Sequence, residues 1–349
     1  MAEPTIVLLP GDGVGPEVTR EAAACLEHLA PDAHLVRHAI GGHALDTVGE
    51  PLPSATLDAC MEADAVFLGA VGNPRYDSAP ESSRPELGLL ALRQALGAWA
   101  NLRPVRVHPA LTDCSPLRPE RVRGADLLIV RELLGGIYFG QPRALTTEPD
   151  GRHALDTMTY TESQVRRIAD MGFRLARQRR KRQLSVDKAN VLACSRLWRA
   201  VVSEVAQDYP DVACEHALVD ACPLRILTDP PDLDVLLCGN LFGDILSDEA
   251  GALCGSLGML PSASIGDGDG GLFEPVHGSA PDLAGTGKAN PVGAILSAAM
   301  LLRHALQRPD AADDLERAVD AALSDGIATP DVGGEATTTE FGDAVRARL

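Results

Sequence analysis

Lysine is scarce in this chain of 349 residues. Of its 31 basic residues only Lys181, Lys188 and Lys288 are lysines, and the others are arginines. Acidic residues number 49, so the formal net charge is -18. Nucleic acids and anionic membranes attract basic surfaces, so the charge balance argues against a general surface for either partner.

Aromatic residues are also scarce, and long apolar runs and metal-type cysteine pairs are missing. Aromatics make up 3% of a chain that is 45% hydrophobic, so Leu, Val, Ile and Ala must build the cores, and the length favours two domains. No stretch reaches membrane-spanning length, and the first residues lack the basic start of an export signal. The eight cysteines form no CxxC pair, which predicts reduced thiols and a cytoplasmic location.

Apolar runs that read as strands alternate with segments of helical spacing. Strands are expected at residues 5–9, 64–72, 126–133 and 234–239, with a helix over residues 16–30 after the first of them. This alternation predicts an α/β protein with parallel or mixed sheets. The glycine-rich turn after the first strand does not fit a dinucleotide fingerprint, because the third glycine would fall at Pro16.

Two segments depart from the alternation. Residues 135–164 have two β-like pieces around the turn EPDG and little apolar content, which predicts a protruding hairpin arm with edges that another chain could cover. Residues 255–291 are rich in glycine, small residues and turns, which favours a long functional loop. Helices over residues 292–305 and 313–323 are expected to close the chain.

Charged side chains gather at the expected ends of elements. Asp244 and Asp248 are four residues apart on one helix face. They could be a pair of ligands for a hard divalent cation, or they could form an acidic first turn that the helix dipole stabilises. Arg93, Arg103 and Arg131 suit bidentate contacts to carboxylates, although an arginine-rich chain places arginines in many positions. These patterns alone leave both alternatives open.

A series of segments resembles the β-decarboxylating dehydrogenases of the isocitrate/isopropylmalate family. The segments are LPGDGVGPEV, RPELGLLALR, ANLRP, VRELLGGIYFG, SVDKANVL, GNLFGDILSDEAG and EPVHGSAPDLAGTGKANP, and the resemblance extends over nearly the whole chain. It implies an isopropylmalate dehydrogenase-like α/β fold with a central sheet, not a Rossmann fold. Residues 1–99 with 255–349 would form the cofactor-side domain and residues 100–254 the metal- and dimer-side domain, with an intersubunit hairpin arm at about 135–164.

The resemblance also implies the site residues. Tyr138 would be the catalytic acid and Lys188 the catalytic base, which would act across a homodimer. Mg2+ or Mn2+ would be held by Asp244 and Asp248 together with Asp220 of the partner subunit. The implied substrate contacts are Glu86, Leu89, Leu90, Arg93, Arg103, Arg131 and Asp220, and the implied cofactor contacts are His277, Gly278, Ser279, Ala280, Asp282 and Asn290.

The implied reaction is the NAD-dependent oxidative decarboxylation of (2R,3S)-3-isopropylmalate to 4-methyl-2-oxopentanoate and CO2, a step of leucine synthesis. Leu89 and Leu90 match the apolar pair that receives the isopropyl group. Asp282 followed by a leucine resembles the NAD pattern, since a carboxylate accepts ribose hydroxyls and repels a 2′-phosphate.

Two alternative functions stay open. Ala221, Cys222 and Pro223 follow Asp220 where the family usually has small and amide residues leading to a methionine. This departure motivates the hypothesis that the protein is a related enzyme that acts on another 3-substituted malate, such as homoisocitrate, tartrate, malate itself or a specialised-metabolite precursor. The alternative of another class is a non-catalytic regulatory subunit that keeps the fold and binds ligand.

Overall fold

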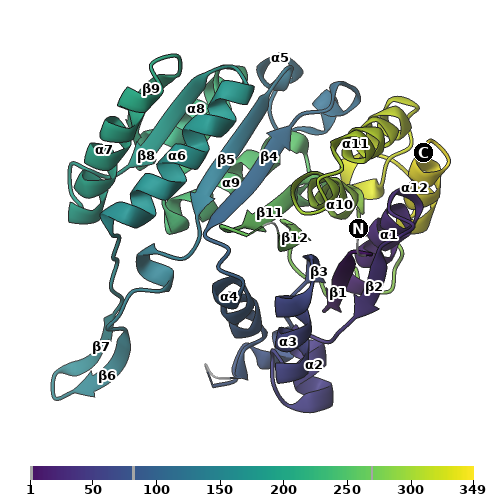
Figure 1. The fold of residues 1–349 in the computed structure, drawn as a ribbon, viewed down its shortest axis with the longest axis horizontal. Coiled ribbons are helices and arrows are strands. Elements are labelled where there is room, and N and C mark those ends of the chain that lie inside the picture. Colours follow the sequence, from purple (N-terminus) through teal and green to yellow (C-terminus); the bar gives the residue numbers. More distant parts are fainter. Residues whose placement is uncertain (1–2, 81–82, 269) are drawn as a thin grey trace. The chain divides into compact units, whose positions relative to one another are not determined.

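The computed structural model describes residues 3–80, 83–268 and 270–349. The chain divides into two compact units, the first made of Met1–Ala98, Val107–Pro119 and Gly251–Leu349, and the second of Trp99–Arg106 and Glu120–Ala250. Each unit contains strands and helices (Figure 1), and together they confirm the predicted α/β class.

The first unit contains a mixed sheet with strand order β2-β1-β3-β12-β11. Neighbouring strands pair in parallel except β11 and β12, which are antiparallel. Every residue of β3 is buried, as expected for a strand that is covered on both faces. The strands are β1 (Thr5–Gly11), β2 (His34–Arg37), β3 (Ala65–Ala70), β11 (Pro261–Ile265) and β12 (Gly271–Pro275).

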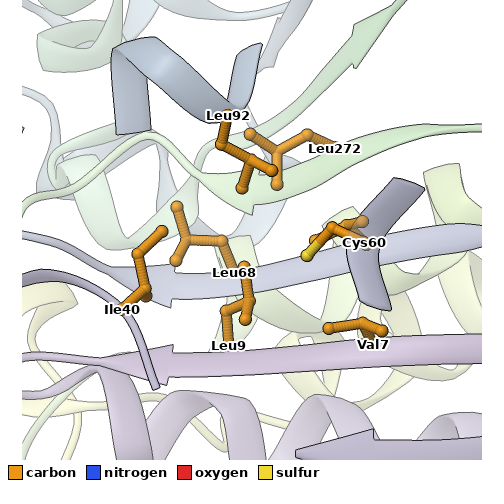
Figure 2. Close-up of a cluster of buried hydrophobic side chains, with 8 residues drawn as sticks. Val7, Leu9, Ile40, Cys60, Leu68, Leu92 and Leu272 are labelled. Atoms are coloured by element: carbon orange, nitrogen blue, oxygen red, sulfur yellow. The ribbon is translucent and has the colours of Figure 1, made fainter. Parts of the chain in front are cut away.

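Helices pack on this sheet and bury aliphatic side chains, as the low aromatic content requires. Figure 2 shows a core cluster in which Leu92 of α4 lies with Leu68 of β3 and Leu272 of β12. α10 is buried along most of its length and packs on α1, α11 and β12. The helices are α1 (Gly15–Leu29), α2 (Gly41–Val48), α3 (Ser54–Glu62), α4 (Pro85–Ala95), α10 (Val292–His304), α11 (Pro309–Ser324) and α12 (Thr338–Arg346).

The second unit contains strands in the order β4-β5-β10-β8-β9. β4 and β5 are antiparallel, and the remaining neighbours are parallel. The strands are β4 (Ala100–Arg106), β5 (Asp126–Glu132), β8 (Arg182–Asp187), β9 (Ala213–Leu218) and β10 (Val235–Cys238). The helices are α5 (Pro119–Val122), which begins at the boundary of the units, α6 (Glu162–Gln178), α7 (Ala193–Val205), α8 (Cys222–Thr228) and α9 (Asn240–Gly251).

The predicted hairpin is present as β6 (Ala144–Glu148) and β7 (Gly151–Leu155), which pair antiparallel around the expected turn. Figure 1 shows it extending away from the sheet of its unit. All residues of both strands are exposed, including Leu145 at 77% and Leu155 at 51%. An isolated two-stranded hairpin is marginally stable in water. We therefore expect these exposed leucines to pack against another protein surface.

The structure corrects two predictions for the C-terminal part. Residues 255–291 are not one long loop, because β11 and β12 lie inside this segment. The sequence PSASI has little strand propensity, and its place in the sheet overrides that weakness. α11 is not the last helix, since α12 follows it and begins with a capping box formed by Thr337 and Glu340.

Within the part of the chain that the structure describes, no helix is both long and apolar enough to cross a membrane.

Candidate active site

The second unit collects predicted site residues at one edge of its sheet. β5, β8, β9 and β10 run parallel, so their carboxyl ends meet at the same edge. Arg131 lies near the end of β5, Lys188 follows β8, and Asp220 follows β9 on a 3-10 turn. α9 starts directly beyond β10 and carries Asp244 and Asp248. The strand order therefore explains why residues far apart in sequence share this edge.

Asp244 is the point where several of these residues meet. One carboxylate oxygen, Oδ1, pairs with Nη1 of Arg131 and lies 3.5 Å from Nη2 of Arg103. The other, Oδ2, accepts a hydrogen bond of 2.8 Å from the Tyr138 hydroxyl. Arg131 and Arg103 are almost fully buried, at 2% and 7% exposure. The site therefore holds its charges in fixed positions instead of on mobile surface side chains.

These contacts fix the protonation states of Asp244 and Tyr138. Burial alone would raise the pKa of Asp244, but the charges of Arg131 and Arg103 outweigh it and hold the pKa below its usual value. Burial and the hydrogen bond to Asp244 raise the pKa of Tyr138 to about 12. At neutral pH the carboxylate is therefore ionised and the phenol keeps its proton.

Asp248 extends the same carboxylate surface one turn along α9. Arg103 donates from Nη1 to Asp248 Oδ1 at 3.2 Å and to Ser247 Oγ at 2.5 Å. The Asp248 side chain is 59% exposed, compared with 31% for Asp244. Two carboxylates on one helix face, with the second open to solvent, match the oxygen donors that a hard divalent cation prefers.

Lys188 and Asp220 form a separate pair. Lys188 Nζ lies 2.5 Å from Asp220 Oδ1, and this hydrogen bond lowers the pKa of Asp220. The turn at Lys188 is fixed by buried Asp187, which accepts from the Ala189 N–H and from two nitrogens of Arg199. Among the described residues no group of three or more His, Cys, Asp or Glu side chains could hold a metal. One chain thus brings Asp244 and Asp248 together without Asp220.

The unusual residues after Asp220 are accommodated without loss of this pair. Pro223 lies in the first turn of α8, where a missing backbone N–H costs no helical hydrogen bond. Cys222 is fully buried, and its thiol contacts the carbonyl of Leu218. Asp220 still reaches Lys188, so these residues leave the Lys188–Asp220 pair intact.

In the first unit, α4 carries four of the predicted substrate contacts. Arg93 donates from Nη2 to Glu274 at 2.6 Å, and both residues are buried. Arg93 Nε has no hydrogen-bond partner in residues 3–80, 83–268 and 270–349. Leu89 packs against the core cluster of Figure 2, whereas Leu90 is half-buried outside that cluster, and Glu86 is exposed. The two leucines therefore have different surroundings.

The predicted cofactor loop is attached to the glycine-rich turn after β1. The Val14 N–H donates to the Ser279 carbonyl at 2.8 Å. Gly13 has a φ of +57°, and a Cβ there would lie 1.9 Å from the same carbonyl oxygen, so only glycine fits. The Gly285 N–H also donates to the carboxylate of Glu17. The glycines of the turn thus allow the loop to approach the backbone closely.

His277 presents an unused acceptor in this loop. Its Nδ1 lies 2.9 Å from the Gly278 carbonyl, which can only accept, so the proton is on Nδ1. Burial lowers the pKa of His277, and its buried Nε2 has no partner within the described residues. A neutral ring with an unpaired acceptor nitrogen fits a ligand that carries a hydrogen-bond donor.

The other predicted loop residues differ in accessibility. Gly278 and Asp282 are exposed, Ala280 is half-buried and Ser279 is buried. Asn290 is buried and occupied within the chain, because it accepts from the Val292 N–H and donates to Asp331. Asn290 therefore shapes the end of the loop, while Asp282 is open to a ligand.

Sequence reasoning missed three polar residues that hold this site. Asn240 binds Arg131, Ser247 binds Arg103, and Glu274 binds Arg93. Asn240 stands just past an apolar strand that the sequence predicts, whereas Glu274 gave no such signal because its strand, β12, was not predicted. Ser247 gave no signal beyond its position between two aspartates.

The second unit gathers buried arginines and paired carboxylates, an arrangement that can bind a small anion, and the first unit carries a loop with an unpartnered histidine nitrogen. The chain belongs to the isocitrate/isopropylmalate dehydrogenase family, whose sequence pattern matches residues 5–345. It is therefore an oxidoreductase of a family that implies a nicotinamide cofactor and a divalent metal ion.

Relatives and solved structures agree with this assignment. The chain is 52% identical to a 3-isopropylmalate dehydrogenase of Anaeromyxobacter dehalogenans, with 99% of each chain covered. It is 54% identical to a 3-isopropylmalate dehydrogenase of a Synechococcus species, over 97% of this chain and 96% of that protein. The fold is similar to that of an isocitrate dehydrogenase from Methylococcus capsulatus, with a TM-score of 0.89, 36% identity and 99% coverage of both chains.

Proposed function

We propose that this chain catalyses the NAD-dependent oxidative decarboxylation of (2R,3S)-3-isopropylmalate to 4-methyl-2-oxopentanoate and CO2, in leucine synthesis. The relatives of 52% and 54% identity carry the name of this activity and support the choice of substrate. The observation that carries the chemistry is the Asp244 carboxylate, which contacts Tyr138, Arg131 and Arg103 at once. A charge cluster of this kind suits a substrate with two carboxylates and a hydroxyl.

The residues present fit the two groups that the family implies. Asp244 and Asp248 supply hard oxygen donors for Mg2+ or Mn2+. The unpartnered His277 Nε2 and the exposed Asp282 suit the adenosine part of NAD. A carboxylate such as that of Asp282 can accept hydrogen bonds from the ribose hydroxyls. When bound, the cation would stabilise negative charge on the substrate oxygens, and the nicotinamide would accept a hydride.

The side chains of this protein have distinct proposed roles. Arg93, Arg103 and Arg131 would hold the malate carboxylates, which fixes the reacting carbons in place. Lys188 in its neutral form would accept the proton of the substrate hydroxyl as the hydride leaves. After CO2 departs, Tyr138 would donate a proton to the enol carbon. Its raised pKa keeps that proton available at neutral pH.

We further propose that a homodimer completes the site. Within one chain Lys188 and Asp220 pair with each other and no third ligand joins Asp244 and Asp248 in the described residues. A partner subunit would supply its Lys188 and Asp220 to the cluster around Asp244. The two compact units would then act as a cofactor-side and a metal-side domain, with the hairpin arm covered by the partner. The eight free cysteines support a reducing, cytoplasmic location.

A panel of substituted malates tests this proposal. The purified chain is assayed for nicotinamide reduction with isopropylmalate, isocitrate, homoisocitrate, tartrate and malate, with NAD+ or NADP+, and with or without Mg2+. Fastest turnover of isopropylmalate with NAD+ and Mg2+ is expected. A preference for another malate would support the alternative suggested by Cys222 and Pro223, and no turnover of any substrate would support a regulatory subunit.

A further inference from the structure

We propose that Asn240 is a positioning residue that holds Arg131 and the turn carrying Tyr138 in one fixed relation. The inference rests on the proposed roles of Arg131 and Tyr138. Asn240 is the first residue of α9 and is fully buried, with 0% exposure. It begins the helix that carries Asp244, two residues beyond the end of β10. It therefore occupies the junction from which the carboxylate cluster is built.

The oxygen of the Asn240 side chain holds Arg131. Asn240 Oδ1 accepts from Arg131 Nε at 3.0 Å and from Nη2 at 2.7 Å. Arg131 uses Nη1 to pair with Asp244. The guanidinium is thus gripped from two sides, and its plane is determined by Asn240 and Asp244 together.

The nitrogen of the same side chain holds the turn that leads to Tyr138. Asn240 Nδ2 donates to the Leu133 carbonyl at 2.9 Å and to the Gly135 carbonyl at 3.0 Å. Tyr138 ends the 3-10 turn that starts one residue after Gly135. Glu132 supports this segment from the other side, accepting from the N–H groups of Leu134 and Gly135. The backbone before Tyr138 is therefore held by these side chains together with backbone hydrogen bonds from Leu133 to Trp99 and from Gly136 to Thr159.

The backbone of Asn240 is fixed as well. Its N–H donates to the hydroxyl of Tyr160 at 2.7 Å, and Tyr160 packs edge-on against Trp198. Gly243, in the first turn of the same helix, lacks a Cβ, and one built there would lie 2.8 Å from the Arg131 side chain. The start of α9 is thus shaped to receive the arginine stem.

Only an amide of this length satisfies all four side-chain contacts. A carboxylate accepts but cannot donate to Leu133 and Gly135, and a serine hydroxyl is too short to reach both sides. Loss of the amide would leave buried carbonyls unpaired and would release Arg131 and the Tyr138 turn together. Loss of the Asn240 amide should therefore impair substrate binding and proton donation together.

The test is a set of double-mutant cycles with the best malate of the panel, NAD+ and Mg2+. Arg131→Lys alone should raise KM, and Tyr138→Phe alone should lower kcat. Asn240→Ser should do both, lowering kcat/KM about 100-fold because misplacement of catalytic groups by about 1 Å has effects of that size. Added to Tyr138→Phe it should lower kcat little further, and added to Arg131→Lys it should raise KM little further.

Ser297→Ala is the matched control. Ser297 is also fully buried but lies on α10 of the first unit, and its hydroxyl donates to the Gly293 carbonyl at 2.7 Å. Its loss should lower Tm and leave kcat and KM unchanged. Additive effects of Asn240→Ser in both cycles would overturn the positioning role while leaving the proposed function standing. Normal KM in Arg131→Lys and normal kcat in Tyr138→Phe would overturn the proposed roles and the inference together.

Tyr160→Phe provides a second route if Asn240→Ser does not fold. It removes only the acceptor of the Asn240 N–H and keeps the ring that fills the space beside Gly135 and Gly136. The same combined change in kcat and KM is expected, at about 10-fold in kcat/KM, since one backbone hydrogen bond is lost. A lower Tm with both constants unchanged would contradict the inference.

Discussion

At the scale of single residues, the proposed chemistry depends on the two oxygens of Asp244. One is neutralised by buried arginine charge, and the other holds the proton of Tyr138 in place. An arginine pair that keeps the carboxylate ionised also keeps it a competent oxygen donor. The same residue can therefore orient the proposed acid and contribute to the proposed metal site.

Removing the Tyr138 hydroxyl tests the acid role. Tyr138→Phe should lower kcat about 100-fold or more, the usual contribution of general acid catalysis, and should leave Tm nearly unchanged. Tyr209→Phe is a close control, because Tyr209 also donates to an aspartate, Asp170, and has its pKa raised to about 12 by burial and that bond. Near-normal kcat in Tyr138→Phe, measured by nicotinamide reduction, would rule out the acid role.

Replacing one carboxylate oxygen tests the metal role. Asp244→Asn keeps the shape but removes the charge, so the Mg2+ concentration for half-maximal activity should rise at least about tenfold. Asp170→Asn, away from the cluster, is the control and should leave the titration unchanged. An unaltered Mg2+ titration in Asp244→Asn would contradict the assignment of this residue as a ligand.

At the scale of elements, α4 carries both a core contact and the proposed substrate contacts. Leu92 lies in the core cluster and Leu89 packs against it. Leu90 lies outside the cluster and is one helical turn from Glu86 and from Arg93 along α4. The family resemblance implies that both leucines contact the substrate. The core contact of Leu89 could not be predicted, because it depends on which strand the helix meets.

Alanine substitutions separate these two leucines. Leu90→Ala should lower kcat/KM for isopropylmalate about 10-fold or more, through lost apolar contact, with little change for malate. Leu89→Ala should instead lower Tm because it leaves space beside the core. Equal effects of the two variants on isopropylmalate and on malate would show that neither leucine sets specificity.

Strong apolar runs such as DLLIVREL and DVLLCG gave their strands directly, whereas β11 and β12 could not be predicted from PSASI and GLFEP. These two segments form strands because they pair with strands that are distant in sequence, and local strand propensity holds no information about such pairing. The same limit applies to Asn240 and Glu274. Their importance comes from arginines that the fold brings to them, and the segments alone show only polar residues at strand ends.

At the scale of the whole molecule, the exposed hairpin is the proposed contact with a partner subunit. Leu145→Asp combined with Leu155→Asp should abolish dimers and activity, because charges cannot be buried in an apolar contact without cost. Light scattering after size-exclusion chromatography measures the mass. Val48→Asp is the control, since Val48 is 61% exposed in the first unit. A double variant that remains dimeric and active would exclude the hairpin from the interface.

The proposed sharing of the site between subunits is tested most directly by mixing two variants that should each have little activity at a Mg2+ concentration that just saturates the wild type. Lys188→Met and Asp244→Asn chains are each purified, mixed in equal amounts, unfolded and refolded together. A mixed dimer has one site with both residues intact, so random pairing should restore about one quarter of wild-type activity. Recovery near that level is the predicted result. No recovery in a mixture that forms mixed dimers would contradict a site built from two subunits.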